Sequence, residues 1–107
     1  MADNFKDRET AFENKFAHDA EMKFKILARR DKLFGLWVAE ILEKEGADAD
    51  AYAKEVIISD LEEPGDADIL RKVIGDLDAA NHLIPEAELV EKLAEFLAVA
   101  EGQLLGD

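Results

Sequence analysis

Apolar side chains recur at helical spacing along the first 41 residues of the chain. The stripe runs from Phe5 to Ile41 in ten steps over 36 residues, a mean of 3.6, which is the repeat of an α-helix. One continuous helix fits this spacing. Two shorter helices fit it equally well, because Asp19 is a favourable cap for a second start. The intervening positions of the stripe are Phe12, Phe16, Ala20, Phe24, Leu27, Phe34 and Val38, with polar Glu9 and Asp31 at the other two.

The two ends of this segment offer different amounts of apolar surface. Residues 33–42 add a second apolar stripe to the first, so we expect other helices to enclose them. Residues 1–18 offer three phenylalanines and small alanines, a narrow strip. An isolated helix shorter than roughly 12 to 15 residues rarely persists in water without tertiary contacts. We therefore expect residues 1–18 to form a helical extension that is mobile in the free protein.

Three further helical segments follow, separated by residues that stop or start helices. Gly46 is expected to end the first segment as a left-handed cap, and Asp48 or Asp50 to open the second. The second segment stops at the run SDLEEPGD, where Pro64 excludes the helical region for the preceding residue and Gly65 permits a turn. The residues expected to face inward from this segment are Tyr52, Val56 and Ile57.

The last two helices show clear apolar faces. Asp66 is expected to cap the third helix and Asn81 to close it, and Pro85 suits the first turn of the fourth. Gly75 fits either a close helix crossing or a tolerated accident, and the apolar pattern of the fourth helix dissolves at Gly102 and Gly106. The predicted inward faces are Ile69, Leu70, Val73, Ile74 and Leu77, then Leu89, Val90, Leu93, Phe96, Leu97 and Ala100.

These patterns predict an all-α protein. Short connections between amphipathic helices favour antiparallel neighbours, and no segment shows the polar/apolar alternation of a strand. We expect a four-helix bundle over residues 19–107, preceded by the helical extension over residues 1–18.

Charge divides the chain in the same way. The formal net charge of −13 argues against nucleic acids and anionic membranes as partners and favours a protein. Residues 1–18 carry 3 basic and 4 acidic side chains (−1), residues 19–32 carry 5 and 3 (+2), and residues 33–107 carry 5 and 19 (−14). No cysteine is present, the start MADNFKDRET does not resemble a signal peptide, and no apolar stretch is long enough to insert directly into a membrane. We expect a cytoplasmic protein.

Few residues suit catalysis or metal binding. Ser59 is the only serine, and a local backbone contact explains it more simply than a triad with His18 or His82. The pair Asp48 and Asp50 and the pair Asp66 and Asp68 lack the central glycine and terminal glutamate of a calcium-binding loop. The sequence contains no glycine-rich phosphate-binding loop. We expect no enzymatic activity, no cofactor and no metal.

The remaining candidate site is the N-terminal segment. Charged residues alternate there with three phenylalanines, which is typical of an amphipathic helix that anchors itself in a groove of another protein. A solvated helix face is the alternative. Directly after the segment comes a basic stretch of Lys23, Lys25, Arg29, Arg30 and Lys32.

The sequence resembles the family of ATP synthase inhibitor subunits called zeta. The resemblance rests on FKDRETAFENKFAHDAEMKFK, ARRDKLFGLWVAE and SDLEEPGDADILRKV in this order. It implies a four-helix bundle whose N-terminal segment enters the catalytic head of a bacterial rotary ATP synthase, between the nucleotide-binding subunits and the central stalk, and blocks ATP hydrolysis. The residues that it implies for this contact are Phe5, Lys6, Asp7, Arg8, Glu9, Phe12, Glu13, Lys15 and Phe16.

An alternative function is a general adaptor whose acidic helical body binds an unrelated cytoplasmic protein. This alternative predicts no selective effect on the ATP synthase. An enzyme is less favoured than either, because the sequence lacks a suitable set of nucleophiles and metal ligands.

Overall fold

The computed structural model describes residues 2–61 and 65–105, and within them the side chains from Ala20 onward. Those residues form helices without any strand, which confirms the predicted all-α class. The four helices are α1 (Ala2–Ile41), α2 (Ala47–Asp60), α3 (Ala67–Ala79) and α4 (Glu86–Leu105). The first segment is therefore one continuous helix, and Asp19 lies inside it instead of starting a second one. None of the described helices is both long and apolar enough to cross a bilayer.

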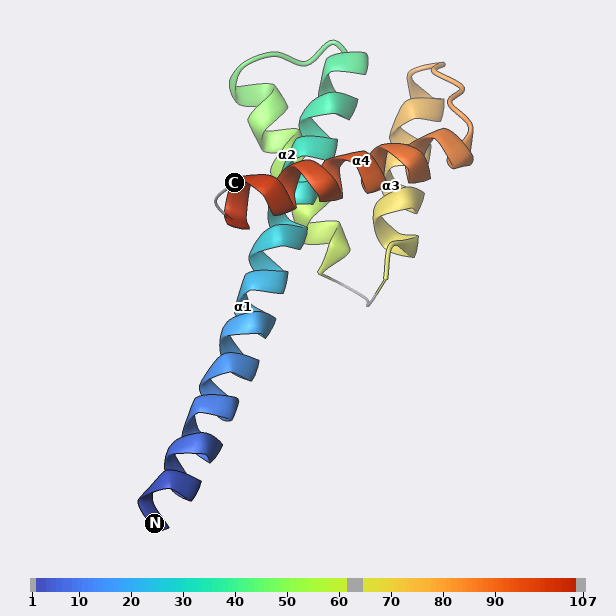
Figure 1. The fold of residues 1–107 in the computed structure, drawn as a ribbon. Coiled ribbons are helices and arrows are strands. Elements are labelled where there is room, and N and C mark those ends of the chain that lie inside the picture. Colours follow the sequence, from blue (N-terminus) through green and yellow to red (C-terminus); the bar gives the residue numbers. More distant parts are fainter. Residues whose placement is uncertain (1, 62–64, 106–107) are drawn as a thin grey trace.

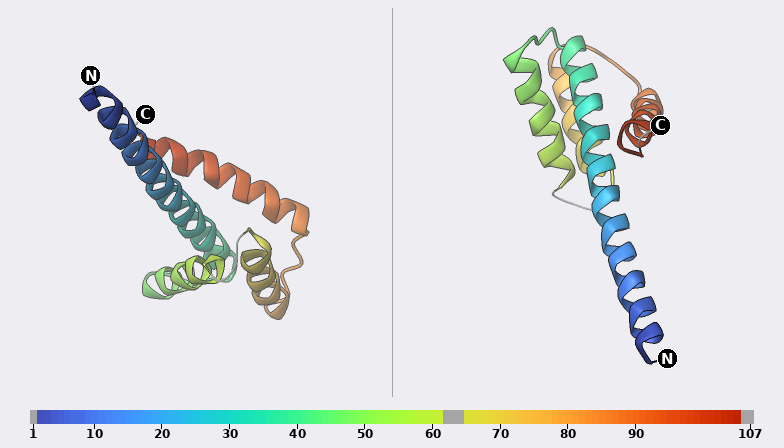
Figure 2. Two further views of the ribbon diagram at one scale, coloured as in Figure 1. Left: turned by 90° about the horizontal axis from the view of Figure 1, so that it is seen from below. Right: turned by 60° about the vertical axis from the view of Figure 1, so that its left-hand side comes forward.

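The second half of α1 is the central element of the bundle. α2 returns antiparallel along one side of it, α3 lies next to α2, and α4 crosses obliquely on the other side (Figures 1 and 2). α1 contacts both α2 and α4 extensively, whereas α3 and α4 touch only slightly. The first half of α1 extends away from the other helices (Figure 1), so the molecule measures 67 × 25 × 21 Å.

The core forms where all four helices meet. Phe34 and Val38 of α1 are fully buried, as the apolar stripe predicts, and Trp37 packs at the edge of the core. The Phe34 and Trp37 rings are stacked with centroids 5.9 Å apart, and Phe96 of α4 lies 6.5 Å from each of them. The rest of the buried cluster comprises Ala39, Tyr52, Val56, Ile69, Val73, Leu77, Leu89 and Leu93.

Two large apolar residues of the predicted patterns are mostly exposed, one on the stripe of α1 and one on the predicted inward face of α4. Phe24 is 55% exposed, because α4 and α2 cover α1 only partly at this level, and Val90 is 49% exposed on α4. α4 continues past Gly102 to Leu105, which directly precedes Gly106, the second of the two glycines at which the apolar pattern dissolves.

α1 ends earlier than the predicted cap at Gly46. Glu43 takes the left-handed conformation (φ 63°), its N–H bonds to the Glu40 carbonyl, and the Lys44 N–H bonds to the Ala39 carbonyl. These are the two bonds of a Schellman motif, so the cap is Glu43. Gly46, also at positive φ, is instead the residue before α2.

The other helix boundaries follow the sequence more closely. Asn81, at φ 64°, closes α3 with the same pair of bonds, donated by Asn81 and His82 to Asp78 and Leu77. Asp48 and Asp50 lie in the first turn of α2, where their negative charge interacts favourably with the helix dipole. Neither side chain caps the helix. The predicted stop at Pro64 lies outside the described residues.

The close helix crossing lies at Gly35 and not at Gly75, for which the sequence left a crossing and a tolerated accident equally open. A Cβ on Gly35 would lie 2.8 Å from the Cα of Ala53, so α1 and α2 meet almost backbone to backbone there. A Cβ on Gly75 would meet nothing within 4 Å, which excludes a close crossing at that position.

Candidate partner-binding arm and its root

The candidate partner-binding segment is the part of α1 that extends away from the bundle. We call residues 2–18 of α1 the arm and residues 20–32, where α1 joins the other helices, the root. The backbone of the arm is helical, so Phe5, Phe12 and Phe16 follow a helical stripe along it. The side chains of the arm lie outside the described residues, so its proposed contacts remain predictions. The residues for which a contact with the partner remains a prediction are Phe5, Lys6, Asp7, Arg8, Glu9, Phe12, Glu13, Lys15 and Phe16.

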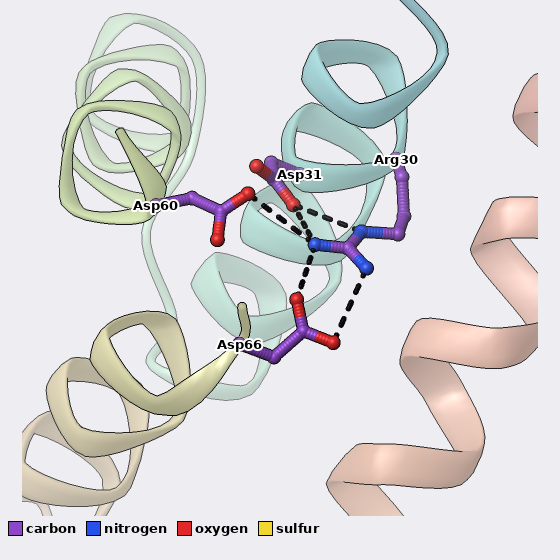
Figure 3. Close-up of polar contacts among 4 residues, drawn as sticks. All are labelled: Arg30, Asp31, Asp60 and Asp66. Atoms are coloured by element: carbon purple, nitrogen blue, oxygen red, sulfur yellow. Dashed lines mark hydrogen bonds and ion pairs between the residues drawn. The ribbon is translucent and has the colours of Figure 1, made fainter. Parts of the chain in front are cut away.

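An ionic cluster around the buried Arg30 holds the root of α1 to the end of α2 and to the residue that precedes α3. Arg30 is only 5% exposed and lies among three carboxylates, those of Asp31, Asp60 and Asp66 (Figure 3). Asp60 comes from the last turn of α2, and Asp66 immediately precedes α3. We call these four residues the root cluster.

The geometry of the root cluster is specific to arginine. The Arg30 Nη2 lies 2.9 Å from Asp66 Oδ1, and the Arg30 Nη1 lies 3.5 Å from Asp66 Oδ2, which gives a bidentate contact. Nε donates to Asp31 Oδ1 at 3.0 Å, and Nη2 reaches Asp60 Oδ2 at 3.3 Å. A lysine has one ammonium group and could not match this planar fork.

The root cluster has more negative than positive charge. Three carboxylates surround one guanidinium, and burial of Asp31 raises its pKa to about 8. The hydrogen bond with Asp60 and the negative charge of Asp60 also raise the pKa of Asp31, while Arg30 lowers it. Asp31 therefore carries a proton over much of the neutral range, which reduces the repulsion inside the cluster.

Partial signals for the root cluster are present in the sequence. Asp31 interrupts the apolar stripe of α1, which indicates that a carboxylate faces inward, and Arg30 is adjacent to it in the basic stretch. Asp66 was predicted as a cap, and it does precede α3, but its carboxylate makes no capping hydrogen bond and binds Arg30 instead. Only the packing of α2 against α1, and of α3 next to α2, brings Asp60 and Asp66 to Arg30 and Asp31.

The basic stretch is split by the fold. Arg30 is buried, whereas Lys23, Lys25 and Lys32 are exposed around the root and Arg29 is partly covered. Arg29 donates a 2.9 Å hydrogen bond to the side chain of Gln103 on α4. The stretch therefore serves both as an anchor inside the protein and as a charged surface outside it.

Catalytic or metal-binding arrangements are not evident among residues 20–61 and 65–105. No group of three His, Asp or Glu side chains there is placed to hold a metal ion. In the same ranges, Ser59 and His82 make no hydrogen bond to another side chain, and His82 is exposed. His18 lies outside the described side chains.

Comparison with known proteins covers the arm, the root and the bundle together. A family model described as ATPase inhibitor subunit zeta matches residues 1–103. A protein whose structure was determined by NMR in solution is 54% identical in sequence, with a TM-score of 0.70 over 78% of this chain and 95% of its own. No curated protein matched the chain.

Proposed function

Because the chain belongs to the ATPase inhibitor subunit zeta family, we propose that it inhibits a bacterial ATP synthase by inserting its arm into the catalytic head. The partners are then the nucleotide-binding subunits and the central stalk, and the protein acts at the cytoplasmic side of the membrane-bound enzyme. The carrying observation is that α1 continues without a break from the core into a segment that leaves the bundle (Figure 1).

The continuity of α1 gives the arm a defined direction. Residues 33–41 are packed between α2 and α4, and the root cluster ties residue 30 to the ends of α2 and α3. A helix that is fixed at one end transmits that orientation along its length, at 1.5 Å per residue. The bundle would therefore aim the arm, while the arm makes the inhibitory contact.

The energetics of the arm favour binding to a partner. Its apolar strip is narrow, and a helix with so few tertiary contacts is marginal in water. A groove in the catalytic head would stabilise the helix and bury its phenylalanines, which act as anchors, while the flanking charges set the register. A groove that exists only in some rotary states would make inhibition depend on the state of the motor.

The decisive experiment compares ATP hydrolysis by the purified ATP synthase with full-length protein and with a variant that lacks residues 1–18. We expect the truncated chain to keep its helical circular dichroism and its cooperative unfolding, because the buried residues identified all lie at position 30 or later. We expect it to lose inhibition. Full inhibition by the truncated chain would refute the proposal.

Point variants in the full-length chain separate the arm from general surface effects. Phe12→Ser and Phe16→Ser remove one aromatic anchor each and should weaken inhibition strongly. Leu83→Ser is the matched control, since Leu83 is 85% exposed in the connection between α3 and α4. Equal inhibition by all three variants would argue against the arm as the contact, whereas no inhibition by the full-length protein would favour the adaptor function.

A further inference from the structure

A groove runs along the root between α1 and its neighbours. One hollow of about 370 Å³ has walls from α1, from Ile57 of α2 and from Leu104 of α4. A second hollow of about 350 Å³ shares Lys32 and Ile57 with the first and extends along α2 to Lys54. The two hollows adjoin at Lys32 and Ile57, and we call the depression formed by these two hollows the basic groove.

The charge of the basic groove is opposite to that of the protein. Its lining contains the cations of Lys25, Arg29, Lys32 and Lys54, and a single carboxylate, that of Asp50. The whole chain has 26 acidic and 13 basic residues, so a groove lined at random would be acidic. The fold thus gathers about a third of the positive charge of an acidic protein along one depression.

These cations are only weakly neutralised within the described part of the protein. Lys25 lies 3.8 Å from Glu21, and both side chains are mostly exposed, which makes the pair worth little. Arg29 binds the uncharged amide of Gln103. No ion pair within residues 20–61 and 65–105 involves Lys32 or Lys54.

The spacing of the cations also disfavours the free helix. Lys25, Arg29 and Lys32 follow each other at i, i+4 and i+7, so they lie on one face of α1 as like-charged neighbours. Such like-charged pairs destabilise a helix. A carboxylate placed between them from outside would convert this repulsion into attraction.

Apolar surface in the groove provides the second half of a binding site. Phe24 is 55% exposed at its edge, and Ile57 and Leu104 are half-buried within it. The aliphatic stems of the lysines add to this surface while their ammonium groups remain at the rim. A ligand that fits must therefore combine apolar side chains with flanking carboxylates.

We propose that the basic groove docks an acidic amphipathic segment of the protein that receives the arm. This inference rests on the proposed function, because it assigns a second contact to the same complex. A protein segment fits better than a nucleic acid or an anionic bilayer, since either of those would extend beyond the groove over the acidic bundle and be repelled there. The groove and the arm share one helix, and Lys25 lies roughly 14 Å along it from Phe16 at 1.5 Å per residue.

This second contact determines how firmly the arm is held in the groove of the catalytic head. Binding at the root converts arm insertion into an intramolecular step at high effective concentration. Loss of the root contact should therefore weaken the apparent affinity for the motor, whereas saturating protein should still inhibit fully, because the arm itself is unchanged.

Charge reversal in the full-length protein tests the inference. We expect Lys25→Glu combined with Lys32→Glu to raise the concentration for half-maximal inhibition of the ATPase about tenfold or more, with maximal inhibition retained. The control combines Lys44→Glu with Lys92→Glu, which changes the net charge equally at positions outside the groove lining. It should shift the half-maximal concentration less than twofold. Thermal unfolding of each variant verifies that the fold is retained.

A carbodiimide cross-link tests the chemistry of the partner directly. This reagent joins a lysine amine to a carboxylate only when the two are in contact, so in the complex it should link Lys25, Lys32 or Lys54 to Asp or Glu residues of a motor subunit. Lys32→Arg keeps the charge but removes the amine, and should abolish links at that position without weakening inhibition.

The possible outcomes distinguish the two proposals. If Phe12→Ser loses inhibition while the groove reversal behaves like its control, the groove inference is wrong and the arm mechanism stands. If the groove reversal weakens inhibition while Phe12→Ser does not, the arm mechanism is wrong and the groove is the contact. Cross-links from the groove to a second copy of this chain alone, or to no motor subunit, would overturn the stated occupant.

Discussion

Gly35 of α1 and Ala53 of α2 meet almost backbone to backbone, since a Cβ on Gly35 would lie 2.8 Å from the Cα of Ala53. This contact brings α2 close to α1 just beyond the root cluster, one helical turn from Arg30 and Asp31. The same approach closes the core around Val56, which a Cβ at Gly35 would also touch. The bundle end of α1 therefore depends on a residue without a side chain.

Gly35→Ala should destabilise the protein. Neither backbone can yield without moving a helix, so we expect a loss of about 1 to 3 kcal/mol of unfolding free energy, or a Tm lower by roughly 4 to 8 °C per kcal/mol. Gly75→Ala is the matched control, because it adds a Cβ to an exposed helix position with nothing within 4 Å. It should stabilise the protein by about 0.5 to 1 kcal/mol. The opposite order in chemical unfolding would contradict the close crossing.

Asp31 should make stability depend on pH. Burial raises its pKa to about 8, whereas an aspartate in the unfolded chain titrates near 4. Between these values the folded protein binds a proton that the unfolded chain lacks, so the unfolding free energy falls as pH rises from about 4 to about 8. The contribution is complete below the lower value and lost above the higher one.

Asp31→Asn isolates this contribution, since the amide resembles the protonated carboxyl and does not titrate. Urea unfolding at pH 5, 6.5 and 8 should show the wild type losing stability relative to the variant as pH rises. Parallel pH profiles for the two proteins would show that Asp31 is ionised throughout and would sink this account of the root cluster.

Tyr52 should resist ionisation. It is buried in α2, and its hydroxyl donates a 2.8 Å hydrogen bond to Asp76 Oδ2 of α3. Burial, that hydrogen bond and the charges of Asp76 and Glu55 raise its pKa well above the ordinary value, although Lys72 lies 5.1 Å from the ring. The chain has one tyrosine, so ultraviolet absorbance of the phenolate reports on this residue alone.

We expect no phenolate signal near pH 10, where a free tyrosine is half ionised, and its appearance only together with unfolding. Because the raised pKa favours the folded state below it, stability should fall as pH increases above about 10. Tyr52→Phe should cost about 1 kcal/mol at neutral pH through the lost hydrogen bond. A free titration of Tyr52 in the folded protein would contradict its burial.

Phe96 should hold α4 on the bundle. Its ring lies 6.5 Å from both Phe34 and Trp37, while α3 gives α4 little additional contact. We expect Phe96→Ala to cost about 3 kcal/mol, and Val99→Ala, on the same helix but 45% exposed, to cost less than 1 kcal/mol. Trp37 is the only tryptophan, so its fluorescence should shift to the red in the first variant and not in the second.

Local patterns were sufficient for the helices. The 3.6-residue spacing predicts α1 as a possible single helix, and the apolar faces of α3 predict Ile69, Val73 and Leu77 as core residues, which the structure confirms. Such features depend on neighbours within a few turns, and these are fixed by the order of residues. The resemblance to the zeta family was also carried by short stretches of sequence, and the family match confirms it.

The contacts between helices were decided only by the tertiary structure. Judged by the residues next to them in the sequence, Gly35 and Gly75 are equally suited to a close helix crossing. Only the path of α2 shows that the crossing lies at Gly35. Likewise, Arg30, Asp60 and Asp66 form a cluster because the end of α2 and the start of α3 lie next to Arg30 inside α1, over separations of 30 and 36 residues. The sequence by itself determined which segments are helical and which faces are apolar, because these depend on local backbone and burial preferences. The tertiary structure determined which polar residues share a buried site and which cations line a groove, because those depend on distances between helices that no local pattern encodes.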